Sequence, residues 1–155
     1  MLMDVIFRVR PEKTVSHDDI KERLLALDRK PKFKIRILTQ KGEQEDLAEI
    51  FFEEELKEIG RKLEKLKQQN VELLDQVEKS LHEELIKSYQ NQFDALENGF
   101  FLRFEDSEII LIKKDLKITE ENEYEIIHEI KVYVAGMFSR LLGNEYVETG
   151  FSVRR

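Results

Sequence analysis

The chain has 155 residues, of which 41% are hydrophobic and 38% are charged, and its formal net charge is −7. This length and composition predict one folded domain with a heavily charged surface. Because the sequence contains no cysteine, it excludes disulfides, thiol nucleophiles and thiolate metal sites.

The sequence also lacks the apolar stretches of membrane and secretory proteins. No window approaches the ~20 apolar residues of a membrane span. Residues 1–9 include Asp4 and Arg8 and contain no hydrophobic core of a signal peptide. We therefore expect a cytoplasmic protein with no membrane partner.

The first 43 residues predict a basic β-α-β unit, since residues 1–41 hold 11 basic and 6 acidic side chains. Apolar and polar residues alternate over residues 4–10 and 33–38, which predicts two strands. Between them, Ser16 is placed to cap a helix that carries Asp18 and Asp19 in its first turn. Nothing in the pattern requires the two strands to be neighbours in a sheet.

Residues 44–98 predict a long acidic helical segment. They contain no proline and one glycine, and they hold 7 basic and 15 acidic side chains. In the first part of the segment, apolar positions alternate steps of four and three, as in a coiled-coil seam. The predicted seam consists of Phe52, Leu56, Ile59, Leu63, Leu66, Asn70, Leu73 and Val77.

Asn70 would occupy position a of the seven-residue coiled-coil repeat, one of its two core positions, where a single asparagine fixes the register of two-stranded coils. Beyond Val77 the apolar residues step mostly by four, which predicts a helix packed on a globular core. An unbroken helix would be about 80 Å long, whereas a compact domain of this size has a radius of gyration of about 15 Å. The segment therefore either projects and pairs with another chain, in parallel or antiparallel, or breaks into a hairpin near Gly60 or Asn70.

Residues 99–155 predict a β-hairpin, a helix and a final strand. The hairpin pairs residues 100–105 with residues 109–112, the helix begins at Thr119, and the last strand spans residues 146–153. The order is therefore β-α-β, long α, β-β-α-β. It predicts a single α+β domain in which strands from both ends of the chain share a small sheet.

No motif for catalysis or nucleotide binding is present in the sequence. Glu125 and His128 form one Glu-x-x-His step, but a di-iron bundle site requires two such steps and two further glutamates. We therefore expect no enzymatic activity, no cofactor and no metal.

Arg8, Arg10, Lys32, Lys34 and Arg36 form a candidate anion-binding edge on the predicted strand pair. The favoured alternative is a solvated face whose basic side chains pair with acids.

Two functions from different classes follow from these patterns. The leading hypothesis is a non-enzymatic assembly or adaptor protein, which forms a homo-oligomer, preferably a dimer, or docks a partner helix through the seam. The alternative is a small regulator that binds nucleic acid through the basic edge or mimics it with the acidic helix. Nucleic acid is the less favoured partner.

Overall fold

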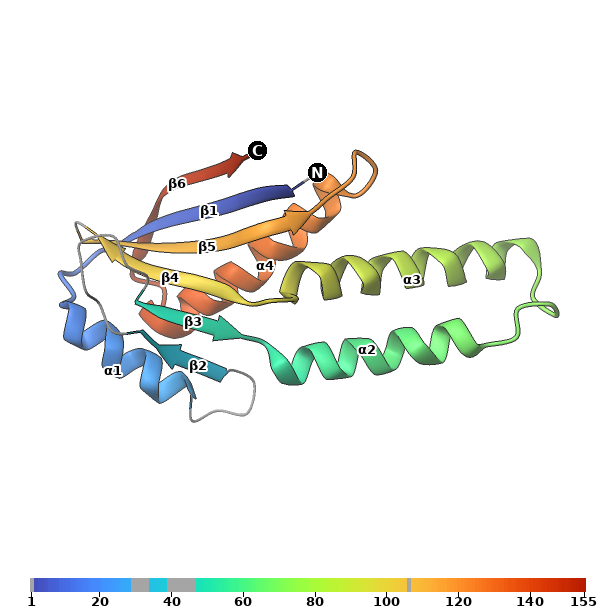
Figure 1. Ribbon diagram of the computed structural model, residues 1–155, viewed down its shortest axis with the longest axis horizontal. Coiled ribbons are helices and arrows are strands. Elements are labelled where there is room, and N and C mark those ends of the chain that lie inside the picture. Colours follow the sequence, from blue (N-terminus) through green and yellow to red (C-terminus); the bar gives the residue numbers. More distant parts are fainter. Residues whose placement is uncertain (1, 29–33, 39–46, 106) are drawn as a thin grey trace.

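The computed structural model describes residues 2–28, 34–38, 47–105 and 107–155. Within these residues, four helices and six strands form a mixed fold with one antiparallel sheet (Figure 1). The elements are β1 (Leu2–Pro11), α1 (His17–Asp28), β2 (Lys34–Ile37), β3 (Ala48–Phe51), α2 (Glu53–Gln68), α3 (Gln76–Leu96), β4 (Phe100–Glu105), β5 (Glu108–Lys117), α4 (Glu123–Leu142) and β6 (Tyr146–Arg154). None of the helices in the described ranges has the length and apolar character needed to cross a membrane.

The sheet has the strand order β2-β3-β4-β5-β1-β6. The N-terminal strand β1 lies between β5 and the C-terminal strand β6, so both ends of the chain contribute to the sheet. Three strands separate β1 from β2. The two strands of the N-terminal β-α-β segment are therefore not neighbours, and β2 forms the edge of the sheet farther from β1.

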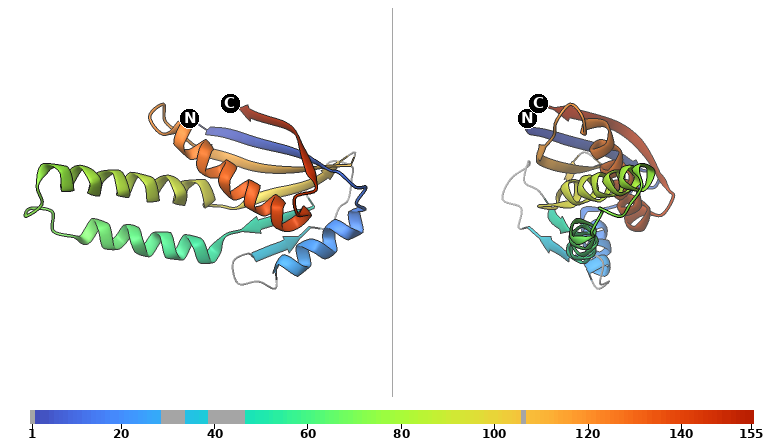
Figure 2. Two further views of the ribbon diagram at one scale, coloured as in Figure 1. Left: turned by 180° about the vertical axis from the view of Figure 1, so that it is seen from behind. Right: turned by 90° about the vertical axis from the view of Figure 1, so that its right-hand side faces the viewer.

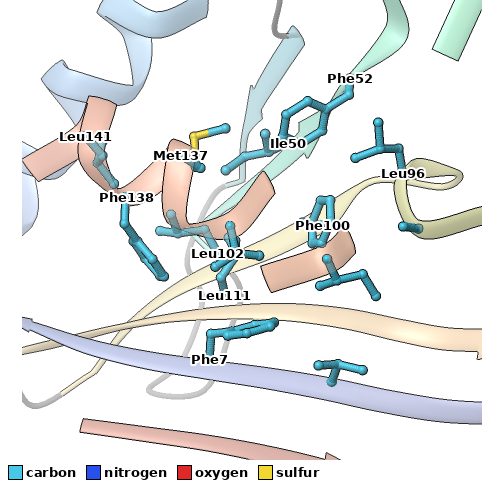
Figure 3. Close-up of a cluster of buried hydrophobic side chains, with 14 of the residues drawn as sticks. Phe7, Ile50, Phe52, Leu96, Phe100, Leu102, Leu111, Met137, Phe138 and Leu141 are labelled. Carbon is cyan, nitrogen blue, oxygen red and sulfur yellow. The ribbon is translucent and has the colours of Figure 1, made fainter. Parts of the chain in front are cut away.

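The hydrophobic core lies between the sheet and the helices α1 and α4, which cover one face (Figure 2). Alternate residues of β1 and β5 point into it, as expected for half-covered strands. Figure 3 shows Phe7, Leu102 and Leu111 of the sheet facing Met137 and Phe138 of α4. The wide apolar stripe of the C-terminal helix is thus buried on the sheet.

The helices α2 and α3 form an antiparallel hairpin, here called the arm, that extends well beyond the sheet (Figures 1 and 2). The sequence left open a single projecting helix or a hairpin over residues 44–98, and the structure has a hairpin, because residues 69–75 separate the two helices. The break is near Asn70, and α2 continues through Gly60. Asp75 begins α3 as its N-cap, and its Oδ1 accepts a hydrogen bond of 2.8 Å from the Glu78 amide.

The strand β3 also corrects the prediction of helix from residue 44 onward. Ala48 and Ile50 are fully buried, whereas Glu49 and Phe51 on the other face are half-buried. This alternation is the period-two pattern of a strand. The strand was missed because its four residues precede a much longer helical pattern without an intervening proline or glycine.

Two predicted helix starts have different outcomes. Ser16 caps α1 as expected, since its Oγ accepts a hydrogen bond of 3.1 Å from the Asp19 amide. In contrast, α4 begins at Glu123 rather than after Thr119. The Asn122 Oδ1 accepts a hydrogen bond of 2.7 Å from the Thr119 amide, so residues 119–122 form a turn before the helix.

The base of the arm is fixed to the sheet by aromatic packing. The Phe52 ring, at the start of α2, lies 5.7 Å from the Phe100 ring and 5.6 Å from the Tyr133 ring. Burial, followed by the nearby carboxylates of Glu55 and Glu129, raises the pKa of Tyr133. The Tyr133 hydroxyl therefore stays protonated, and it donates a hydrogen bond to Glu55.

A buried lysine holds the junction between α3 and β4. The Lys113 ammonium donates hydrogen bonds to the backbone carbonyl oxygens of Glu97 and Gly99, the second at 3.1 Å. Only 2% of Lys113 is exposed. Burial lowers the pKa of Lys113 to about 8, against a smaller opposing effect of the Glu97 carboxylate. The lysine thus supplies donors to carbonyls at the end of α3, which no residue within the helix can reach.

Candidate functional site

The arm contains the predicted seam, but the structure divides that seam into two parts. Phe52, Ile59 and Leu63 are buried, and Leu56 and Leu66 are half-buried. Most of these side chains belong to the core cluster that also contains Ile86 and Phe93 of α3. The first part of the seam is therefore covered within the chain.

The second part of the seam is exposed at the tip of the arm. Asn70 is an exposed turn residue, and its Oδ1 accepts a hydrogen bond of 3.0 Å from the Glu72 amide. Such a side-chain contact mimics a backbone turn. In the single chain Asn70 is therefore not a buried a-position residue, and Leu73 and Val77 do not share a helix with Leu63.

Four aliphatic side chains near the tip and along α3 are exposed to solvent, and we call them the arm stripe. The exposed fractions are 94% for Leu73, 68% for Val77, 64% for Leu81 and 43% for Leu85. Steps of four keep the last three on one side of α3. The expectation that apolar residues beyond Val77 pack on a core is thus wrong for this half of α3, although Leu96 at its end is fully buried.

The arm stripe continues a side of α3 that is covered nearer to the sheet. Steps of three and four residues lead from Leu85 to Ala95, which is fully buried. On the same side, the Asn91 Nδ2 donates a hydrogen bond of 2.7 Å to Glu125 of α4. The helix α4 therefore covers this side near the sheet, and the arm extends past it (Figure 2).

The surroundings of the arm stripe are acidic. Residues 70–88 contain five carboxylates and two lysines. The carboxylates are Glu72, Asp75, Glu78, Glu83 and Glu84, and all five residues are exposed. A partner for this surface should therefore combine an apolar face with a basic border.

The residues of the candidate anion-binding edge do not form one edge. Arg8 and Arg10 are on β1, and Lys34 and Arg36 are on β2, four strand spacings away, or about 19 Å. Lys32 lies outside the described residues. Arg36 pairs with Glu49 at 2.8 Å, and the Lys34 ammonium lies 3.6 Å from Glu53 of α2.

These basic residues nevertheless share one face of the sheet, the one opposite α1 and α4. Directly paired residues point to the same face, and Arg36, Glu49, Phe101, Ile112 and Ile6 form one row across five strands. The next row contains Arg103, Ile110 and Arg8. Sequence reasoning missed Arg103 and also Lys114, whose ammonium lies 4.6 Å from the Phe101 ring centroid, because only strand pairing brings them to this face.

The described residues contain no group of three or more histidine, aspartate or glutamate side chains placed to hold a metal ion. Glu125 accepts a hydrogen bond from Asn91, whereas His128 lies on a different surface of α4. The fold and these surfaces define a mixed helix and sheet protein with a projecting helical arm. No protein-family model, curated protein or solved structure matches the chain.

Proposed function

We propose that the protein is a non-enzymatic adaptor that docks an amphipathic helix of a partner protein on the arm stripe. The observation that carries this proposal is the exposure of Leu73, Val77, Leu81 and Leu85 on an element that extends away from the rest of the fold. Exposed contiguous apolar surface of this kind is typical of interaction sites. A helix laid along α3 would bury these side chains as anchors spaced by about one turn.

The apolar contribution to docking is substantial. Burial of one aliphatic side chain stabilises a complex by roughly 1.5 to 3 kcal/mol relative to full exposure. Because the four residues are 43 to 94% exposed, their burial supplies on the order of 5 kcal/mol before the entropic cost of association. This value supports a weak complex by itself, so the charged border contributes to affinity and specificity.

The charge of the border favours a different protein over a second copy of this chain. In a symmetric dimer through the arm stripe, Glu78 and Glu84 of one chain would approach the same carboxylates of the other. A partner helix bordered by lysine or arginine avoids that repulsion. The homodimer expected from the seam is the competing arrangement.

The test uses two designed helical peptides with identical leucine positions. One carries lysine and the other glutamate at the positions beside the leucines, and binding is measured by fluorescence anisotropy. We expect the lysine peptide to bind at least about tenfold more tightly. Binding should be lost in the double variant Val77→Glu, Leu81→Glu and kept in the control Glu83→Gln, which lies away from the arm stripe on α3.

Equal affinity for the two peptides, or unchanged binding by the double variant, would contradict the proposal. Light scattering on the unaltered protein tests the competing arrangement. A stable dimer that dissociates in the double variant would show that the arm stripe serves self-association.

A second candidate function rests on the basic face of the sheet. Arg8, Arg103 and Lys114 lie around Ile110, Ile112 and the half-buried Phe101 on a face that no described helix covers. Basic side chains beside an aromatic ring are typical of surfaces that bind single-stranded nucleic acid. The pairs of Arg36 and Lys34 with acids, however, favour the adaptor.

If the protein has this second function, it should bind a single-stranded oligonucleotide, and the logarithm of the binding constant should fall linearly with the logarithm of the salt concentration. Arg8→Gln should then reduce the slope by roughly one. The absence of any binding at low salt would exclude it.

A further inference from the structure

A groove lies between α4 and β6, with β1 as its floor, on the helix-covered side of the sheet. Its volume is about 370 Å³. A second cavity of about 360 Å³ shares His128 and Lys131 with it and extends toward the start of α4. At that end, Arg155 pairs with Glu123 at 3.1 Å, so the end of the chain is tied to the first turn of α4.

The lining of this α4–β6 groove is mainly apolar. The rings of Phe7 and Phe151 lie 5.1 Å apart, and Phe138 and Ala135 contribute from α4. Although it belongs to this cluster, Phe151 is 43% exposed. The small side chain of Ala135 leaves the space between α4 and β6 open. The volume is within the range of about 300 to 1,000 Å³ that is typical of small-molecule sites.

The basic group of the groove is the ammonium of Lys131. The Lys131 ammonium lies 4.2 Å from the centroid of the Phe151 ring. Among the described parts of the chain it forms no ion pair, so the ring is the group that attracts it. His128 and the carboxylate of Glu148 also line the groove. Arg8 borders it from β1, but its side chain points to the opposite face of the sheet, in the row of Ile110 and Arg103. A cation held over a ring at an apolar groove can accept an anionic group without first losing another carboxylate.

We propose that the α4–β6 groove binds a small organic acid with an aliphatic body. The carboxylate binds the Lys131 ammonium and an imidazole N–H of His128, and the hydrocarbon packs on Phe7 and Phe138. Lys131 and His128 are one helical turn apart, so one carboxylate can reach both side chains. The second cavity is bordered by Glu120 and Glu123, which repel a carboxylate and place it at the junction of the two cavities. This site is separate from the arm stripe and goes beyond the adaptor function.

The test is a titration of the isotope-labelled full chain with octanoate, followed by amide chemical shifts. We expect saturable shifts confined to residues 7–9, 128–138 and 148–151. Lys131→Met, which keeps most of the stem but removes the charge, should weaken binding at least about tenfold. Lys87→Met, on the exposed surface of the arm, is the matched control and should bind octanoate like the unaltered protein.

Two further measurements keep the proposal testable if Lys131→Met alters the groove. Ala135→Leu adds volume at an exposed helical position and should exclude octanoate while the protein stays folded. Octan-1-ol, which has the same hydrocarbon without the charge, should bind more weakly than octanoate.

Non-saturable or scattered shifts, or equal affinity of octanoate for the unaltered protein and Lys131→Met, would overturn the proposal. Tighter binding of N-acetyl-leucine than of octanoate would also overturn it, since the site would then recognise the carboxyl end of a peptide.

Discussion

Replacement of Lys113 by methionine should change how the stability of the protein depends on pH. In the folded protein the pKa of Lys113 is lowered from 10.5 to about 8 by burial. Below about pH 8 the ammonium is charged in both the folded and the unfolded state, and the folded state bears the full cost of burying it. Between about pH 8 and 10.5 the folded protein loses the proton first, so its stability rises with pH.

The size of this effect follows from the two pKa values. With about 1.4 kcal/mol per pH unit, the contribution of Lys113 to the free energy of unfolding increases by about 2.5 kcal/mol between pH 7 and 10. Methionine removes this increase. It also leaves the carbonyl oxygens of Glu97 and Gly99 without their lysine donor, at a cost of roughly 1 to 3 kcal/mol each, which is nearly independent of pH.

The assay is urea unfolding of the unaltered protein and of Lys113→Met, followed by circular dichroism at several pH values. The difference between their free energies of unfolding is the measured quantity, because other titrating groups, such as Tyr133, affect both proteins alike. We expect this difference to grow by about 2.5 kcal/mol from pH 7 to 10 in favour of the unaltered protein. A constant difference over that range would refute the assignment of the lowered pKa to Lys113.

Four other substitutions test the packing of the arm and of its junction with β4. Leu63→Glu, which places a carboxylate at a buried position, should lower the free energy of unfolding by several kcal/mol, whereas Leu73→Glu at a 94% exposed position should change it by less than about 0.5 kcal/mol in the same urea titration. Asn70→Leu removes a turn hydrogen bond and should lower the free energy of unfolding by about 0.5 to 1 kcal/mol, with a slightly lower melting temperature. A higher melting temperature would indicate that Asn70 is buried in an oligomer. Gly99→Ala should destabilise by more than about 1 kcal/mol, because Gly99 has a φ of +70° and an added Cβ would lie 2.6 Å from the Ile50 carbonyl oxygen; calorimetry showing an unchanged melting temperature would contradict this.

Features that depend on neighbouring residues could be predicted from the sequence. The Ser16 cap, the alternation over residues 4–10 and the pairing of β4 with β5 each depend on a few adjacent side chains. The buried stripe of α4 follows from the 3.6-residue period of a helix. These local preferences agree with the folded structure, so the elements lie close to where the pattern places them.

The sequence by itself therefore determined a mixed helix and sheet protein with a long helical middle segment. Only the tertiary structure decided that the segment turns back near Asn70, since a four-three spacing is equally satisfied by a partner chain and by the chain's own second helix. The pattern of apolar residues does not show which of them are buried in the folded protein. Leu63 and Leu81 are both leucines in an apolar stripe of a helix, but Leu63 is buried and Leu81 is 64% exposed. Leu63 is buried because it packs with Ile86 and Phe93 of α3 inside the arm, whereas Leu81 lies on a side of α3 that no other described element covers. These contacts join residues far apart in the chain.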